Sequence, residues 1–167
     1  MSSARTREVI AERMGIPVRD LYGLAREYLD NKAQASILVS RIDKMQKGKD
    51  ILGDIPETDL TEDEKKILFI VRGWKKRLFE LELSICRYEL AVGALDARER
   101  MVLHLHFEKG YSMSQISQMN LRKYSVEKRS VRTLNRVRQT LAEKFCERYA
   151  AESPFSMSAI ADERRAQ

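Results

Sequence analysis

The residues best suited to chemistry lie between Ser117 and Arg148, where nine Lys or Arg side chains accompany three Glu. Their surplus of positive charge equals the formal net charge of the whole 167-residue chain, which is +6. A basic block confined to one segment is typical of a polyanion site, because cationic side chains neutralise phosphates and release the counterions around nucleic acid. The charge distribution therefore predicts a nucleic-acid interface.

The side chains of this block are of the types that read duplex DNA. If Ser125 caps a helix that extends to about Arg148, a step of about 100° per residue separates an apolar face from a cationic one. Arg binds guanine and Asn or Gln binds adenine at the base edges, whereas Lys neutralises phosphate. We expect Lys128, Arg129, Arg132 and Asn135 in the major groove, Arg136 and Gln139 between groove and backbone, and Arg122 and Lys123 at phosphates. Ser130 is the alternative cap, so the first residue of this recognition helix stays open.

Two shorter helices are expected to position the basic helix. Asp96 and Glu99 form a capping pair that begins a helix reaching about Glu108, and Gly110 ends it. Ser112 caps a short helix that carries Met113, Ile116 and Met119. Residues 94–149 are therefore predicted to form a three-helix DNA-binding domain, followed by a flexible tail over residues 150–167.

Residues 95–145 resemble region 4 of the bacterial sigma-70 family. The resemblance is carried by the segment LDARERMVLHLHFEKGYSMSQISQM, with its apolar positions and its turn at Gly110. The connection NLRKYSVEKRS is longer than the glycine turn that the family places before its recognition helix. The resemblance implies a helix-turn-helix that binds double-stranded DNA.

The N-terminal half has a different pattern, with apolar residues alternating three and four apart over 18–47 and again over 61–93. Turn-forming residues around Gly48 to Pro56 separate the two series, so an antiparallel coiled-coil hairpin is predicted over residues 18–93, after an N-terminal extension over residues 1–17. Trp74 is expected to be buried in the seam. A second stripe, Phe79, Leu83, Cys86 and Leu90, would be covered by the C-terminal domain or by a second subunit, which allows a homodimer through the hairpin.

Other classes of protein find less support. His104 and His106 would point about 200° apart on a helix with no acidic or Cys cluster beside them, so no metal is expected. No cofactor-binding or catalytic motif is present, and we expect a protein that is not an enzyme. Because no apolar run reaches about 18 residues, no membrane contact is predicted. The chain has two cysteines, which are expected to be reduced thiols in the cytoplasm.

The whole chain is thus predicted to be all-α and to act as a sequence-specific transcriptional regulator. Chains with a helical N-terminal half and an end similar to sigma region 4 resemble phage and prophage late-gene regulators of the ArpU and RinA type. That resemblance implies an operator near a promoter and a contact with RNA polymerase. Two alternatives stay open: a phage terminase small subunit, which would form a ring of subunits, and a structural coiled-coil adaptor.

Overall fold

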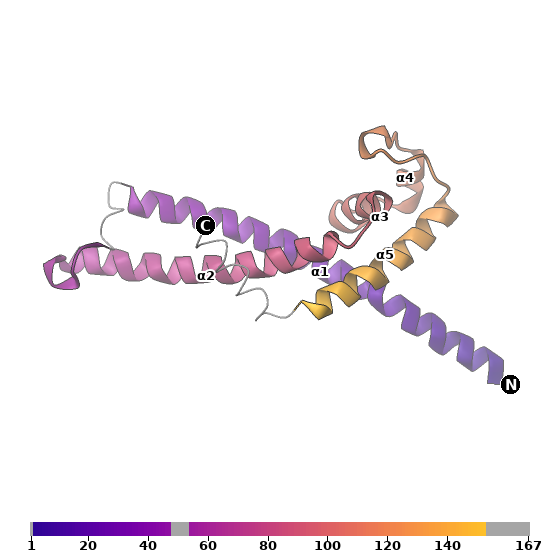
Figure 1. The fold of residues 1–167 in the computed structure, drawn as a ribbon, viewed down its shortest axis with the longest axis horizontal. Helices are drawn as coiled ribbons and strands as arrows, with labels where there is room; N and C mark the ends of the chain where they lie inside the picture. The colour runs from indigo at the N-terminus through magenta and orange to yellow at the C-terminus, as the bar shows by residue number, and fades with distance from the viewer. Residues whose placement is uncertain (1, 48–53, 153–167) are drawn as a thin grey trace. The chain divides into compact units, whose positions relative to one another are not determined.

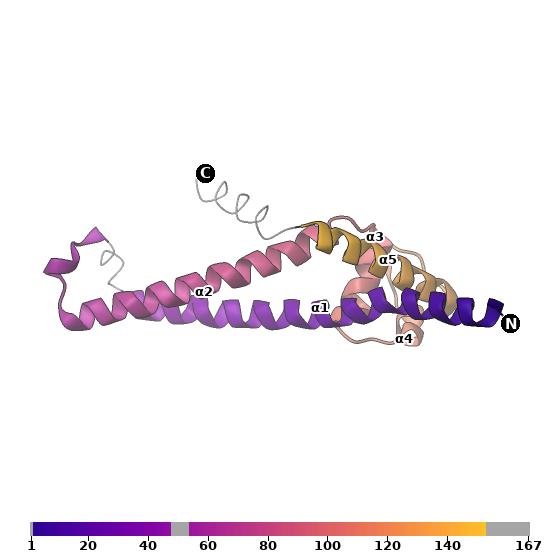
Figure 2. The ribbon, with the colours of Figure 1, turned by 90° about the horizontal axis from the view of Figure 1, so that it is seen from below.

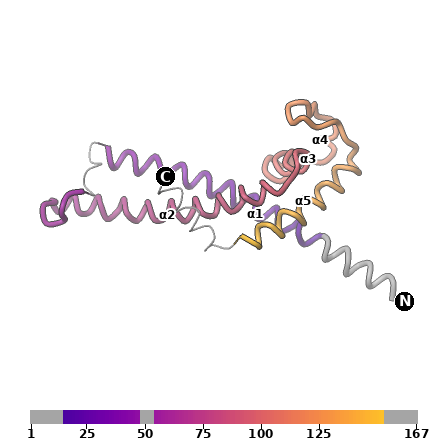
Figure 3. Tube along the Cα trace, in the orientation of Figure 1, coloured from indigo at the N-terminus to yellow at the C-terminus, as the bar shows by residue number. Residues whose placement is uncertain are grey.

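The computed structural model describes residues 2–47 and 54–152, and within them the side chains from Gly15 onward. Every regular element of this part of the chain is helical, which confirms the all-α prediction (Figures 1 and 3). None of its helices has both the length and the apolar character needed to cross a membrane. In chain order the elements are α1 (Ser2–Gln46), η2 (Glu57–Asp59), α2 (Glu62–Val92), α3 (Ala97–Val102), η3 (Leu103–Glu108), α4 (Met113–Gln118), η4 (Arg122–Tyr124) and α5 (Val131–Ala151).

The chain divides into two compact units that differ from the predicted boundaries. One unit comprises Met1–Leu29 together with Cys86–Gln167, and the other is Asp30–Ile85. The predicted hairpin over residues 18–93 is therefore shared between the two units. The physical reason is burial, since Leu21, Ala25 and Tyr88 lie in the same hydrophobic core as Leu95 and Phe145.

In the unit Asp30–Ile85, the segments 30–46 of α1 and 62–85 of α2 lie side by side and run in opposite directions (Figures 1 and 2). Arg77 Nη2 donates to Gln34 Oε1 at 3.5 Å between the two segments. At the start of α2, Thr61 and Glu64 form a reciprocal cap: each backbone N–H donates to the other side chain, at 2.9 and 3.2 Å. The buried apolar residues of this unit are Leu38, Ile42, Leu60, Val71 and Leu81.

Trp74 is half-buried and not enclosed, so the prediction of a buried ring is wrong. The apolar series of α2 contains half-buried positions as well as buried ones. At Trp74 the reason is that two helices alone cannot surround a side chain as large as indole. The second predicted stripe is likewise half-buried at all four positions, Phe79, Leu83, Cys86 and Leu90.

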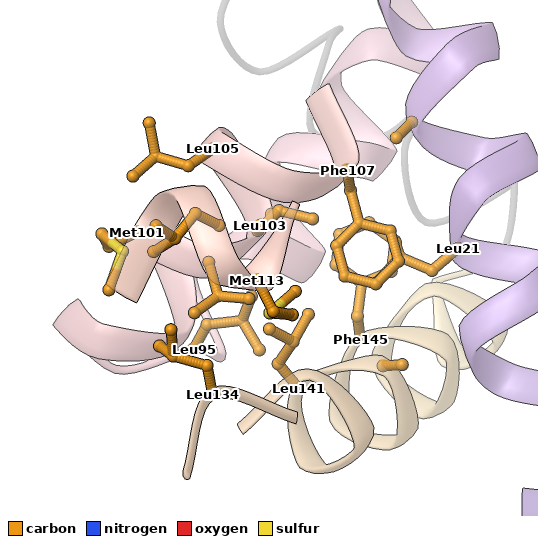
Figure 4. Close-up of a cluster of buried hydrophobic side chains, with 14 of the residues drawn as sticks. Leu21, Leu95, Met101, Leu103, Leu105, Phe107, Met113, Leu134, Leu141 and Phe145 are labelled. Carbon is orange, nitrogen blue, oxygen red and sulfur yellow. The ribbon is translucent and has the colours of Figure 1, made fainter. Parts of the chain in front are cut away.

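In the other unit, α1, the end of α2, α3, η3, α4 and α5 contribute to one hydrophobic core (Figure 4). Phe145 of α5 has no exposed surface, and the centroid of its ring is 4.8 Å from that of Tyr88. The ring of Tyr88 stacks on that of Tyr28; their centroids are 4.0 Å apart and their planes are nearly parallel. Burial of Tyr28 and its hydrogen bond to Glu89, at 3.1 Å, raise the pKa of Tyr28 to about 12. The aromatic contacts join α1 and α2 to the C-terminal helices within this unit.

The segment predicted as an N-terminal extension is part of α1, which contains Pro17. Proline has no backbone N–H to donate to the preceding turn and normally disfavours a helix interior. Val18 and Leu21, directly after it, pack in the core, and Cys146 Sγ donates to the Pro17 carbonyl at 3.5 Å. Burial raises the pKa of the Cys146 thiol, as expected for a reduced cysteine in an apolar site. The predicted tail beyond residue 152 lies outside the described residues.

Candidate nucleic-acid interface

The start of α5 decides which basic residues are helical. Ser130 is the N-cap: it has an extended backbone, and its Oγ accepts from the Thr133 N–H at 3.3 Å. Ser125 instead has a left-handed conformation, with φ of 55°, and follows the turn η4. The helix start predicted at Ser125 is therefore wrong, and the alternative at Ser130 is the one observed. Lys128 and Arg129 precede the helix.

The connection between α4 and α5 is held by apolar anchors. Leu121 is buried, and the half-buried side chains of Met119, Tyr124 and Val126 pack against the core. Asn120 Oδ1 accepts from the Arg122 N–H at 3.1 Å, which fixes the turn before η4. A connection anchored in this way presents its basic side chains from a defined backbone.

Helix α5 has one apolar face and one polar face. Leu134, Leu141 and Phe145 have no exposed surface and pack in the core shown in Figure 4. Arg132, Asn135 and Arg136 are exposed, and the half-buried Gln139 donates from Nε2 to Glu143 Oε1 at 3.1 Å. Among the described residues, Arg132 and Arg136 take part in no ion pair. Their guanidinium groups face solvent over the first two turns of the helix.

The predicted site residues therefore fall into two groups. The helical group lies on one face of α5 and consists of Arg132, Asn135, Arg136 and Gln139. The connection carries the other group, namely Arg122, Lys123, Lys128 and Arg129. The structure does not place Lys128 and Arg129 on the helical face that the sequence predicted, because the chain is not helical before Val131.

Within the connection, the basic side chains have different surroundings. Arg122, Lys123 and Lys128 are exposed, and the Lys123 ammonium lies 5.0 Å from the centroid of the Tyr124 ring. Arg129 is half-buried with Nη2 at 3.7 Å from Glu127 Oε2, and its buried Nε has no partner among the described residues. Arg122, Lys123 and Lys128 are therefore more accessible to an anion than Arg129.

Arg98, to which sequence reasoning gave no role, lines a hollow together with Arg129 and residues 125–127 of the connection. The hollow has a volume of about 430 Å³, and Asp96 also lines it. The sequence could not bring Arg98 and Arg129 together because the course of the connection depends on the buried anchor at Leu121.

An ion pair between the buried Glu99 and the half-exposed Lys144 joins α3 to α5. Glu99 is only 4% exposed, and its Oε1 accepts from Lys144 Nζ at 2.9 Å and from the Asp96 N–H at 3.1 Å. Asp96 Oδ1 accepts from the Glu99 N–H at 2.9 Å, completing the predicted capping pair. The backbone hydrogen bond from Glu99 lowers the pKa of Asp96. This contact makes Lys144 structural, although it belongs to the same basic block as the site residues.

The two histidines have structural partners. His104 Nδ1 lies 3.4 Å from Glu108 Oε1, whereas His106 Nδ1 donates to the Tyr111 carbonyl at 2.7 Å and its Nε2 bonds the Tyr22 hydroxyl. Within the described residues, no group of three or more His, Cys, Asp or Glu side chains could hold a metal ion. Burial, and then the nearby Arg138 guanidinium, lower the pKa of His106 from its usual value of 6.5.

The His106 site predicts a loss of stability in mild acid. Because folding lowers its pKa, His106 contributes its full stability above pH 6.5 and loses it progressively as the pH falls toward the folded-state pKa. His106→Gln keeps a donor and an acceptor but does not titrate. In thermal denaturation across this range, the melting temperature should fall less with acidification in His106→Gln than in the wild type. Parallel curves would contradict a neutral, half-buried His106.

No protein-family model, no curated protein and no solved structure matches this chain. A functional conclusion therefore depends on the geometry of α5 and of the connection before it.

Proposed function

We propose that this protein is a sequence-specific transcriptional regulator that binds double-stranded DNA through α4 and α5, which act as a helix-turn-helix. The observation that carries the proposal is the division of α5 into two faces. Leu134, Leu141 and Phe145 are fully buried, whereas Arg132, Asn135 and Arg136 are exposed. A helix anchored by one face can present the other to a major groove, which is about 12 Å wide.

The residues in each group have separate roles in this proposal. Arg132, Asn135 and Arg136, with Gln139 beside them, contact base edges, since guanidinium and amide groups form paired hydrogen bonds with guanine and adenine. Arg122, Lys123 and Lys128 contact phosphates on the flank of the groove, because cations there add affinity without sequence preference. Arg129 is assigned to the same flank.

We assign residues 94–149 to a domain similar to sigma region 4 and the helices before it to a helical hairpin. This arrangement suits a phage or prophage late-gene regulator that binds beside a promoter and contacts RNA polymerase. The side-by-side segments of α1 and α2 and the capped helices α3 and α4 support this assignment.

The proposal is tested by selecting bound fragments from random duplex DNA with the full chain, then measuring affinity for the selected site and for a scrambled duplex. A sequence-specific regulator should enrich one motif and bind it at least about 1000-fold more tightly than the scrambled duplex. Enrichment of no motif would contradict the proposed specificity, and absence of binding to any duplex would contradict the proposed function.

Lys123→Ala should weaken binding to every duplex alike and reduce the slope of log affinity against log salt by about one. The reason is the loss of one phosphate neutralised by an exposed ammonium group. Fluorescence anisotropy over a series of salt concentrations measures both quantities. Lys76→Ala removes another exposed lysine, on α2, and serves as the matched control, which should retain the wild-type slope. A loss confined to one sequence would contradict the assignment of Lys123 to phosphate.

A further inference from the structure

The face of α2 around Phe69 exposes a large apolar surface within the unit Asp30–Ile85. Phe69 is 79% exposed and the adjacent Ile70 is 40% exposed. With Leu68 they line a groove of about 510 Å³, here called the Phe69 groove. Removing apolar surface from water is favourable, so adjacent exposed side chains of this size favour a binding partner.

The rim of the Phe69 groove carries both signs of charge. Two carboxylates and three cations line it: Glu57, Glu62, Lys65, Lys66 and Arg72. Arg72 Nη1 lies 3.2 Å from Glu57 Oε1, and Lys65 Nζ lies 3.2 Å from Glu62 Oε1. The carboxylates disfavour a nucleic-acid partner, and a rim with nearly balanced charge does not match a strongly acidic or basic protein.

A second copy of the same surface does match this rim. In an isologous contact each surface meets itself across a two-fold axis, so the Arg72–Glu57 and Lys65–Glu62 pairs of one copy can extend into a network with the oppositely charged members of the same pairs in the other. A surface of one sign would repel itself in such a contact. We propose that two copies of this chain associate through the Phe69 groove, with Phe69 of each copy seated against the groove of the other.

Such a dimer would also have a consequence for DNA binding. Two chains carry two copies of α5, and paired recognition helices bind two half-sites related by a two-fold axis. The expectation of an inverted-repeat operator rests on the proposed function, whereas the association of the two chains does not.

The association is tested by sedimentation equilibrium of the full chain over a series of concentrations. The apparent mass of the wild type should rise from 19.4 kDa toward twice that value, and Phe69→Glu should stay at the monomer mass throughout. Val39→Glu is the matched control, because it places the same charge at another exposed apolar position, 44% exposed on α1 and outside the groove. It should associate as the wild type does. Circular dichroism should show the same helix content and melting temperature for Phe69→Glu as for the wild type at monomer concentrations.

Three results would overturn the proposal: a wild type that stays monomeric, a Phe69→Glu variant that dimerises normally, or a loss of association in Val39→Glu equal to that in Phe69→Glu. Co-sedimentation with vesicles of anionic phospholipid tests whether a lipid surface occupies the groove. If a monomeric wild type sediments with them and Phe69→Glu does not, a lipid surface is the occupant and the proposal is wrong.

A DNA measurement separates this proposal from the proposed function. On a duplex carrying the selected site as an inverted repeat, the wild type should bind cooperatively, whereas Phe69→Glu should bind each half-site independently with unchanged affinity. If no duplex binds either protein, the proposed function fails while the sedimentation result still decides the association.

Discussion

Phe145→Ala should lower the free energy of unfolding by about 3 to 5 kcal/mol, the usual cost of removing a fully buried aromatic ring. Phe145 has no exposed surface, and its ring lies 4.8 Å from that of Tyr88 and 6.0 Å from that of Tyr149. It belongs to the core that also contains Leu21 of α1 and Phe107 of η3 (Figure 4). Urea denaturation followed by circular dichroism measures the change.

Phe69→Ala is the matched control, because it makes the same substitution at a ring that is 79% exposed. At concentrations where the chain is monomeric, it should change the free energy of unfolding by no more than about 0.5 kcal/mol. If Phe145→Ala cost as little as the control, α5 would not be anchored by its apolar face, and the proposed presentation of Arg132 would lose its support.

Helix starts were predictable wherever the two members of a capping pair stand three residues apart. Thr61 with Glu64 and Asp96 with Glu99 each form reciprocal hydrogen bonds in the structure. Ser112 is the N-cap of α4, as predicted, and exchanges hydrogen bonds with Gln115. Caps are local, so their geometry depends on a few adjacent residues and can be inferred from sequence.

The start of α5 could not be settled in the same way. Ser125 and Ser130 are both suitable caps, and Val126 has the spacing of the apolar face whichever serine is chosen. The choice depends on the buried Leu121 and on the left-handed turn at Ser125, which together keep the chain non-helical up to Ser130. The burial of Leu121 is a tertiary contact, which local propensity does not determine.

The boundary between the two units could not be predicted from the sequence for a related reason. The apolar repeat of α2 continues without a break from Ile67 to Val92, although its last part packs in the C-terminal core. A repeat shows which face of a helix is buried, but not which partner buries it. The same limit explains Trp74, whose position in the repeat is apolar but whose surroundings leave the ring half-buried.

Of the candidate interface, the sequence predicted the residue types and the helical face of α5, but not the placement of Lys128 and Arg129. Arg132, Asn135, Arg136 and Gln139 share one face under either helix start, because their spacing within the helix does not depend on its first residue. Lys128 and Arg129 belonged to that face only if the helix began at Ser125. The proposal is therefore most sharply tested at Arg132, in the first turn of α5.

Arg132→Ala should weaken binding to the selected site by about 1 to 3 kcal/mol, or about 5- to 150-fold, and should relax the preference at one base position. Arg132 is exposed in the first turn of α5, where a guanidinium group can reach the O6 and N7 atoms of a guanine. Titration of the wild type and the variant against duplexes with each base at every position measures both effects.

Arg132→Lys separates base contact from charge. Lysine keeps the positive charge but cannot reproduce the planar pair of donors of a guanidinium group. We expect Arg132→Lys to lose most of the discrimination at that base position while it retains the salt dependence of the wild type. Arg148→Ala is the matched control, because Arg148 lies in the last turn of α5 and pairs with Glu152 at 2.8 Å. It should bind the selected site as the wild type does. If Arg132→Ala weakened all duplexes equally, Arg132 would contact phosphate, and base recognition would have to come from Asn135 and Arg136.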